Sequence, residues 1–484
     1  MQKISVKTIY LILVISIGLV GLGVGSTFAM FTASSEIDNP ISFTAGIFGE
    51  SDVIETVEVT VPAGETKATN LHVTNSTNSN LNYVMWYIDE GLDIELGSKR
   101  TDSGTYQTTI GAGEEHQYEV SIRNNSNSDV TVVIGVSSGT GSVTLSSDMK
   151  MVPQSELKPT LASVITNLYN NSTKTPVVNN SITYQYDTTN NLMQDTAGNI
   201  RYYGATPKNY VYFNCDSYPS TNCELWRIIG VFDGKIKLMR NETIGKYSWD
   251  TSASSVNSGS GVNEWSQADL MKLLNPGHES ESVGGSLYYN SKSGTCYSGQ
   301  SNATTSCNFT STGIKNDTTR NMIADITYNT GGHTTSNVFS NVMYEKERGI
   351  TTVSNPSDGI TRTTTWTGKI ALAYPSDYGY ATDLSKCSQT LYDYDNSTDS
   401  YACRTNDWMY PIITNSGKTY GWLLTPYSSY ANNAFSVGSA GYVSGGSNGV
   451  CNANGVAPVL YLGSNQNIVA GDGSQSKPYQ LANS

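Results

Sequence analysis

Residues 225–239 read Leu-Trp-Arg-Ile-Ile-Gly-Val-Phe-Asp-Gly-Lys-Ile-Lys-Leu-Met, which is two apolar runs joined by Asp233-Gly234. An Asp-Gly pair accepts the left-handed backbone that a tight two-residue hairpin turn needs, so this stretch predicts a β-hairpin. A further apolar strand is expected to begin at Tyr210. The segment therefore favours a mainly β fold, with α+β character in the C-terminal part.

Short helices are expected within this C-terminal part. Between residue 263 or 264 and residue 274, Trp265, Ala268, Met271 and Leu274 share one helical face, and the Asn-Pro-Gly that follows ends the helix. A second helix is expected over residues 318–327, and strands and turns return from residue 421 onward. We expect a small α+β domain with long polar loops over residues 201–484.

The N-terminal part shows strand periodicity. Residues 53–61 alternate with period two, as a half-buried strand does, and more strands are expected at 68–74, 81–88, 117–123, 129–136 and 142–145. The turn Val61-Pro-Ala-Gly-Glu65 recurs as Ile110-Gly-Ala-Gly-Glu114, through duplication or through reuse of common turn chemistry. Roughly 100 residues of such short strands predict an immunoglobulin-like β-sandwich over residues 40–152.

Residues 153–200 are interpreted as a helix and a linker. Apolar side chains from Leu157 to Leu168 recur at helical spacing, with Ser155 as the expected N-cap and Pro159 in the first turn. Residues 170–189 are rich in Asn and Thr, which favours an extended linker.

The first 33 residues have the layout of a secretion signal. Two lysines precede an uncharged apolar run over residues 9–25, and small residues lead to an expected cleavage site near Ala29, or failing that near Ala33. An uncleaved anchor is the alternative, because a run of about 17 residues is at the lower limit of a membrane-spanning helix. We expect a secreted or cell-surface protein that contacts a membrane only through this segment, if it is retained.

Composition narrows the classes of partner. The formal net charge is −13 and only 14% of residues are charged, while Asn, Ser, Thr, Gly and Tyr are abundant. An acidic surface repels phosphate backbones, so no nucleic-acid partner is expected.

All seven cysteines lie after residue 200. In an exported protein the default is disulfide bonding, and sequential pairing joins Cys215 to Cys223, Cys296 to Cys307 and Cys387 to Cys403, although spacing alone does not determine connectivity. Cys451 remains single. Because neither CxxC nor HxxxH spacing occurs, no zinc site is expected.

Five distinct motifs follow one another in the C-terminal part. They are Leu225-Trp-Arg-Ile-Ile-Gly230, Trp265 through Leu274-Asn275, Tyr374-Pro-Ser-Asp-Tyr-Gly-Tyr380, Gly421-Trp-Leu-Leu-Thr-Pro426 and Gly455-Val-Ala-Pro-Val-Leu-Tyr-Leu462. Together they resemble domain of unknown function 6273, which is found in exported proteins of Gram-positive gut bacteria. The closing motifs are also similar to the C-type lectin-like fold of formylglycine-generating enzymes and variable receptor-binding proteins. The resemblance implies a C-type lectin-like domain over residues 201–484.

A second resemblance concerns the N-terminus. Ala29-Met-Phe-Thr32, followed by residues 39–46 ending in Phe43-Thr-Ala-Gly46, is similar to the start of TasA and camelysin-type envelope proteins. These carry a β-sandwich after such a start, which agrees with the strand pattern.

No catalytic, metal or cofactor site is assigned. The lectin calcium triplet Glu-Pro-Asn or Gln-Pro-Asp is absent and Asn406-Asp407 is an isolated fragment, so no calcium site is expected. HExxH is absent as well, and no glycine-rich phosphate loop opens a helix. Cys451 with His278 or His333 would offer a nucleophile and a base, but an unpaired cysteine and loop histidines are the commoner explanation.

A binding surface is expected in residues 427–454, between two apolar strands. Tyrosine gives contact area and a hydrogen bond at low entropic cost, and Asn adapts to polar partners, although an ordinary polar loop is the alternative. The candidate ligand-binding residues are Tyr427, Tyr430, Asn432, Asn433, Tyr442 and Asn448. We expect a non-enzymatic adhesion or recognition protein for an extracellular glycan or protein. A self-associating envelope or biofilm-matrix subunit is the alternative, followed by an uncharacterised hydrolase.

Overall fold

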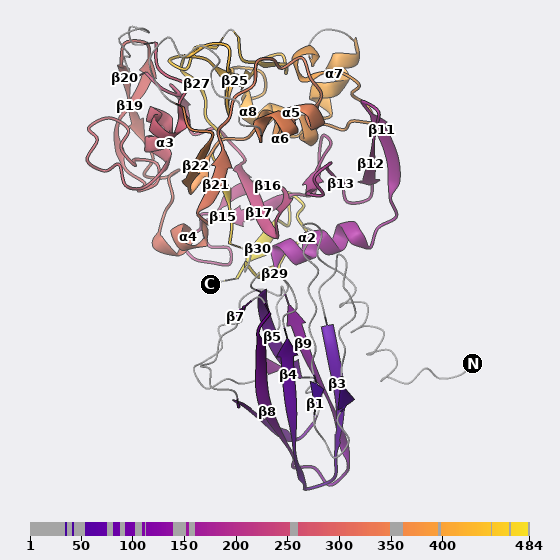
Figure 1. The fold of residues 1–484 in the computed structure, drawn as a ribbon. Coiled ribbons are helices and arrows are strands. Elements are labelled where there is room, and N and C mark those ends of the chain that lie inside the picture. Colours follow the sequence, from indigo (N-terminus) through magenta and orange to yellow (C-terminus); the bar gives the residue numbers. More distant parts are fainter. Residues whose placement is uncertain are drawn as a thin grey trace. The chain divides into compact units, whose positions relative to one another are not determined.

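The computed structural model is mainly β and divides into two compact units, residues 1–171 with 464–468, and residues 172–463 with 469–484 (Figure 1). The residues it describes are 34–35, 41–42, 54–74, 81–87, 92–101, 109–111, 113–138, 152–153, 160–251, 260–348, 362–394, 398–446, 448–463 and 466–482. The expected secretion signal at residues 1–33 and the expected strand at 142–145 lie outside these ranges.

The N-terminal unit contains two main sheets. One has the order β10-β5-β9-β3, with β7 paired to β5, and the other has the order β4-β8-β6. Their strands are β3 (Ile54–Val61), β4 (Thr66–Thr74), β5 (Leu81–Tyr87), β6 (Ile94–Arg100), β7 (Thr109–Ile110), β8 (Glu115–Asn124), β9 (Val130–Ser138) and β10 (Val152–Pro153). A small ribbon pairs β1 (Ser34–Ser35) with β2 (Ile41–Ser42).

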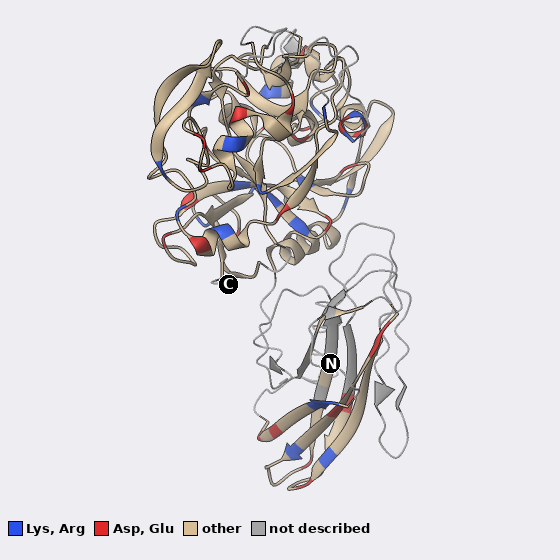
Figure 2. Ribbon diagram, turned by 60° about the vertical axis from the view of Figure 1, so that its left-hand side comes forward, with Lys and Arg blue, Asp and Glu red and all other residues tan. Residues whose placement is uncertain are grey.

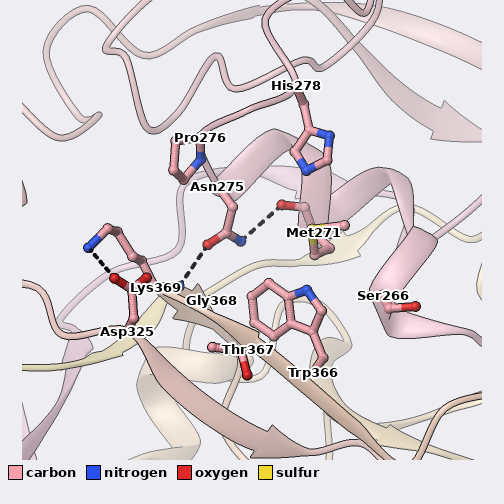
Figure 3. A pocket seen from close by; sticks show the side chains of 10 residues that line it. All are labelled: Ser266, Met271, Asn275, Pro276, His278, Asp325, Trp366, Thr367, Gly368 and Lys369. Atoms are coloured by element: carbon pink, nitrogen blue, oxygen red, sulfur yellow. Dashed lines mark hydrogen bonds and ion pairs between the residues drawn. The ribbon is translucent and has the colours of Figure 1, made fainter.

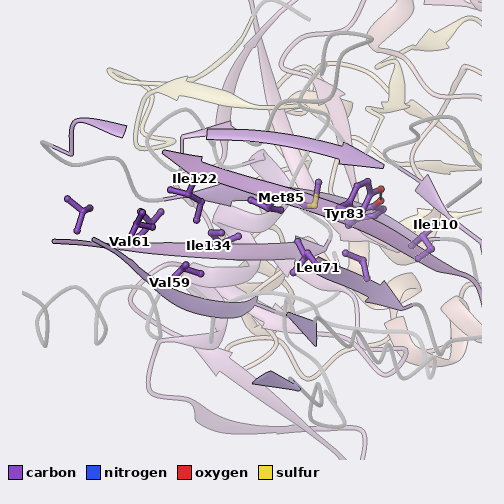
Figure 4. Close-up of a cluster of buried hydrophobic side chains, with 13 residues drawn as sticks. Val59, Val61, Leu71, Tyr83, Met85, Ile110, Ile122 and Ile134 are labelled. Carbon is purple, nitrogen blue, oxygen red and sulfur yellow. Dashed lines mark hydrogen bonds between the residues drawn. The ribbon is translucent and has the colours of Figure 1, made fainter. Parts of the chain in front are cut away.

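Alternating side chains from both sheets form one apolar core. Along β8 every second residue is buried, including Tyr118, Val120 and Ile122. These pack with buried residues of β3, β4, β5, β7 and β9 (Figure 4). The period-two pattern in the sequence thus identifies the core faces of the strands.

Two details differ from or extend the sequence prediction. Strand β6 was not expected, because Ile-Glu-Leu-Gly-Ser-Lys-Arg is polar and its residues are exposed or half-buried. The two repeated turns have the same geometry: Gly64 and Gly113 have φ of 71° and 73°. In each turn the glutamate that follows donates its N–H to a carbonyl oxygen three residues earlier, at 3.1 Å.

The connecting segment is more ordered than predicted. Helix α2 (Leu161–Asn170) begins after Thr160, whose hydroxyl accepts the Ser163 N–H, so Thr160 is the N-cap in place of Ser155. Where a linker was expected, β11 (Thr175–Asn179) and β12 (Ile182–Asp187) form a hairpin. The turn is Asn180-Ser181 with both φ values positive, a geometry that Asn tolerates better than most residues.

The C-terminal unit is built on an eleven-stranded sheet, counting described strands. Its main path is β11-β12-β13-β14-β16-β15-β30-β29, and β17, β28 and β23 continue from β16. The remaining bounds are β13 (Leu192–Gln194), β14 (Ile200–Tyr202), β15 (Tyr210–Phe213), β16 (Glu224–Phe232), β17 (Lys235–Arg240), β23 (Ile370–Ala371), β28 (Val459–Tyr461), β29 (Ile468–Ala470) and β30 (Tyr479–Leu481).

The predicted hairpin at the centre of this sheet is confirmed. β16 and β17 pair antiparallel through the turn at Asp233-Gly234, which has φ values of 48° and 71°. A bulge follows Ile228, and a Cβ at Gly230 would lie 2.2 Å from the carbonyl oxygen of Ile200. Glycine at 230 therefore allows β14 and β16 to approach each other.

A second sheet has the order β18-β27-β24-β25-β26. Its strands are β18 (Lys246–Tyr247), β24 (Gly421–Pro426), β25 (Ala434–Val437), β26 (Val443–Ser444) and β27 (Asn454–Gly455). Two ribbons complete the strands: β19 (Ser293–Gly299) with β20 (Ala303–Asn308), and β21 (Ile326–Asn329) with β22 (Thr365–Gly368).

The helices of this unit are short. They are η2 (Trp265–Gln267), α3 (Asp269–Leu274), α4 (Asp317–Met322), α5 (Ser340–Glu347), α6 (Pro375–Ala381), η3 (Leu391–Asp393), α7 (Thr398–Thr405) and α8 (Tyr410–Ile413). The single helix expected up to Leu274 is broken at Ala268, whose backbone is extended. The helix expected over 318–327 ends at Met322, because the chain enters β21 at Ile326.

Three disulfides join Cys215 to Cys223, Cys296 to Cys307 and Cys387 to Cys403, which confirms the sequential pairing. Cys451 is a free, buried thiol. Three such bonds are typical of an oxidising, extracellular environment. Charged residues are few and scattered along the ribbon (Figure 2).

Candidate functional site

Two tyrosines form a partly exposed platform where β24 ends. The rings of Tyr427 and Tyr430 stack with centroids 5.7 Å apart and planes 17° apart. Tyr430 is 54% exposed, whereas Tyr427 is half-buried and meets the ring of Phe435 edge-on at 5.5 Å. Phe435 thus holds the Tyr427 ring in place, and Tyr427 in turn holds the exposed Tyr430 ring. Tyr430 can therefore contact a ligand at low entropic cost.

A buried amide holds the loop that carries the two tyrosines. The Nδ2 group of Asn263 donates to the carbonyl oxygens of Tyr427, Tyr430 and Asn433 at 3.2, 2.8 and 2.7 Å. Asn263 is fully buried, so these bonds are shielded from water. The backbone of the loop is therefore fixed from within the unit.

A buried guanidinium strengthens the same attachment. Arg362 donates from Nε to Oδ1 of Asn263 and from Nη2 to the carbonyl oxygen of Ala431, both at 2.6 Å. Glu264 accepts the N–H and the hydroxyl of Thr363 at 2.9 Å each. The loop and the segments around residues 263 and 362 thus form one hydrogen-bonded assembly.

The other candidate ligand residues are placed differently. Asn433 and Asn448 are 9% and 7% exposed. The Asn433 amide donates to the carbonyl oxygens of Gly445 and Gly446, and the Asn448 amide donates to the Ser436 hydroxyl at 2.6 Å. Both side chains thus hold the β25–β26 hairpin and its return loop.

Tyr442 and Asn432 complete the predicted set. Tyr442 lies at the far end of the hairpin, where its hydroxyl is 2.9 Å from that of Tyr420. Asn432 is half-buried beside the loop, and its carbonyl oxygen accepts the N–H of Val450. The structure therefore brings Tyr427 and Tyr430 together at a partly accessible surface, leaves Asn432 half-buried in the same loop, and places Tyr442 elsewhere.

His333 packs against the base of this loop and was not part of the predicted surface. It forms a parallel bridge with Tyr427, and its carbonyl oxygen accepts the N–H of Ser428 at 2.9 Å. Burial is the main cause that lowers the pKa of His333, and the positive charge of Lys346 lowers it further. Its Nε2 atom is buried with no hydrogen-bond partner among the described residues. The imidazole is therefore neutral at pH 7.

Cys451 lacks the features of an activated nucleophile. Burial is the main cause that raises the pKa of its thiol, so the thiol stays protonated at neutral pH. Within the described part of the chain, no three His, Cys, Asp or Glu side chains converge to hold a metal ion.

A cluster of buried charged side chains lies inside the C-terminal unit, and the sequence did not predict it. Arg201 donates to Asp195 at 2.6 Å and to Asp377 at 2.8 Å, and Lys237 lies 2.5 Å from the second Asp377 oxygen. Burial lowers the pKa of Lys237 to about 8. Burial alone would raise the pKa of Asp377, but Lys237 and Arg201 lower it to about 2.

Comparison of the chain with models of known families, with curated proteins and with solved structures finds no match. In the described ranges, no helix is long and apolar enough to span a membrane.

Proposed function

We propose that this chain is an exported, cell-surface or secreted protein whose C-terminal unit recognises an extracellular glycan or protein. The observation that carries the proposal is the stacked Tyr427–Tyr430 pair, with an exposed ring on a loop fixed by Asn263 and Arg362. Rigid aromatic groups beside adaptable polar groups are typical of binding surfaces. The three disulfides agree with a location outside the cell.

We also propose a fold for each of the two units. The N-terminal unit is proposed to be an immunoglobulin-like β-sandwich, supported by its two antiparallel sheets around a shared core. The C-terminal unit is proposed to be C-type lectin-like and related to domain of unknown function 6273. Support comes from the apolar strands β24 and β28, which precede and follow in the sequence the loop that carries Tyr427 and Tyr430 (residues 427–433, the tyrosine loop).

Binding of the mature protein to glycan and extracellular-protein arrays tests this function. Tyr430→Ala should reduce the signal at least about tenfold, since a central aromatic contact contributes roughly 2 kcal/mol. Tyr401→Ala is the matched control, because Tyr401 is 62% exposed but lies on α7. Equal loss in both variants would indicate nonspecific adhesion by tyrosines and contradict the proposal.

A structural envelope or matrix subunit is the second candidate. Among the described strands, β3 and β6 each end the strand order of their sheet. Edge strands have backbone groups that can pair with another chain. Concentration-dependent fibre formation by the mature chain, together with no array binding, would favour this candidate.

A further inference from the structure

A second feature, separate from the tyrosine loop, is a half-open hollow of about 280 Å³ (Figure 3). It lies between the β21–β22 ribbon, helix α3 and the segment that follows α3. Trp366, Met271 and His278 line it, together with Asp325 and Lys369. Its volume is at the low end for small-molecule sites, which suits a ligand with a single ring.

One wall of the hollow is an immobilised indole. The Trp366 ring meets Trp265 edge-on at 6.0 Å and lies tilted over Tyr328 at 5.6 Å. A Cβ at Gly368 would lie 2.2 Å from the six-membered ring of the indole, so glycine at 368 lets the ring lie across the strand. Trp366 therefore offers a flat apolar surface whose position is fixed before any ligand binds.

The back of the hollow is also preformed. Asn275 donates from Nδ2 to the carbonyl oxygens of Met271 at 3.0 Å and Ile370 at 2.8 Å. Its Oδ1 accepts the N–H groups of Lys369 and Ile370 at 3.1 and 2.9 Å. With the amide fully used, Asn275 joins the end of α3 to β23 and sets the shape of the hollow.

The polar groups around the indole are mixed in type and balanced in charge. Asp325 and Lys369 form a 3.2 Å ion pair on one side of the indole, and the Asp325 side chain is 66% exposed. Half-buried His278 lies on the other side with Ser266, whose hydroxyl donates to Glu264 and keeps its oxygen free to accept. The rim thus offers hydrogen-bond donors and acceptors, and the charges of Asp325 and Lys369 balance each other.

We infer that this hollow is a carbohydrate subsite that takes one neutral pyranose unit against Trp366. A pyranose has an apolar face of C–H groups that packs on an indole, and its hydroxyls both donate and accept hydrogen bonds. An organic cation binds best inside a cage of several aromatic rings, whereas Trp366 is the one tryptophan, tyrosine or phenylalanine among the described residues that line this hollow. An anion is disfavoured by the exposed Asp325.

Saturation-transfer NMR on the mature protein tests the inference. The probes are the methyl glycosides of glucose, galactose and mannose, and N-acetylglucosamine, each at millimolar concentration. At least one probe should receive saturation from the protein. Asp325→Asn, at an exposed position, should weaken that binding about tenfold, because the hydrogen bond to the sugar no longer involves a charged group.

Two further variants complete the design. Gly368→Ala should displace the indole and abolish binding while leaving the rim groups in place, and a thermal melt confirms that the variant is folded. Tyr430→Ala should leave sugar binding at the hollow unchanged, so this result is separate from the fate of the tyrosine surface. The inference is overturned if no probe binds, or if binding persists unchanged in folded Gly368→Ala and Asp325→Asn proteins.

Discussion

Replacement of Asp377 by Asn should destabilise the C-terminal unit severely. Asp377 is 1% exposed and compensates both Arg201 and Lys237, which are themselves 1% and 0% exposed. It also accepts the N–H of Tyr374 at 3.0 Å at the start of α6. A neutral amide would leave Lys237 without the carboxylate it contacts and Arg201 with Asp195 alone.

Two independent estimates give the size of the effect. Breaking a buried ion pair by removing one partner costs about 3–5 kcal/mol. The fall in the pKa of Asp377 from 3.8 to about 2 corresponds to about 2 kcal/mol of native-state stabilisation, at 1.36 kcal/mol per unit. We therefore expect a loss of about 2–5 kcal/mol in the free energy of unfolding.

Urea unfolding followed by tryptophan fluorescence measures this loss, because six of the seven tryptophans lie in the C-terminal unit. Asp325→Asn is the control, since its ion pair is exposed and should contribute less than about 1 kcal/mol. Adding Lys237→Met to Asp377→Asn should recover part of the loss by removing the uncompensated cation. A loss below about 1 kcal/mol in Asp377→Asn would refute the assigned role of the cluster.

Three further outcomes are expected. Asn263→Ala removes the amide that donates to the carbonyl oxygens of the tyrosine loop and accepts from Arg362, so it should cost about 2 kcal/mol of stability in urea unfolding and weaken array binding along with Tyr430→Ala. Burial raises the pKa of Asp407 to about 7, so the folded state keeps its proton while the unfolded state loses it near pH 4. The contribution of Asp407 to the free energy of unfolding is thus fully present below pH 4 and is lost as pH rises through 7, a fall of about 4 kcal/mol. Asp407→Asn should flatten this pH dependence when the free energy of unfolding is measured from pH 4 to 8. Replacing Cys387 and Cys403 together by Ser should cost about 2–4 kcal/mol, and an unchanged denaturation midpoint would show that this disulfide is dispensable.

The sequence predicts the features whose signals are local. The β16–β17 hairpin follows from Asp233-Gly234, and the core faces of β3 and β8 follow from their period-two alternation. Three short-range disulfides follow from nearest-neighbour pairing. In each case the determining residues lie within a few positions of one another.

The sequence does not predict features that depend on long-range contacts. Asn263 and Arg362 fix the tyrosine loop from positions more than 60 residues away in the chain. From its place in the strand, Lys237 looks like a residue on the solvated face. It is nevertheless buried against Asp377, which lies 140 residues later. No local pattern distinguishes these side chains from ordinary surface residues.

Polar residues in an Asn- and Ser-rich stretch are a second source of error. Asn433 and Asn448 resemble surface residues in the sequence. In the structure their amides donate hydrogen bonds to the Gly445 carbonyl oxygen and the Ser436 hydroxyl inside the hairpin. The Asn- and Thr-rich segment after α2 likewise contains the β11–β12 hairpin, because Asn also favours left-handed turns. Composition alone does not separate these roles from those of a flexible loop.

The central claim is that the C-terminal unit binds a ligand through the Tyr427–Tyr430 surface. Its most direct test is array binding by the mature protein, followed by titration of the strongest ligand against wild type, Tyr430→Ala and Tyr401→Ala. We predict a specific ligand whose affinity falls at least about tenfold in Tyr430→Ala and stays unchanged in Tyr401→Ala. Unchanged affinity in the folded Tyr430→Ala protein, or the absence of any specific ligand for wild type, would contradict the claim.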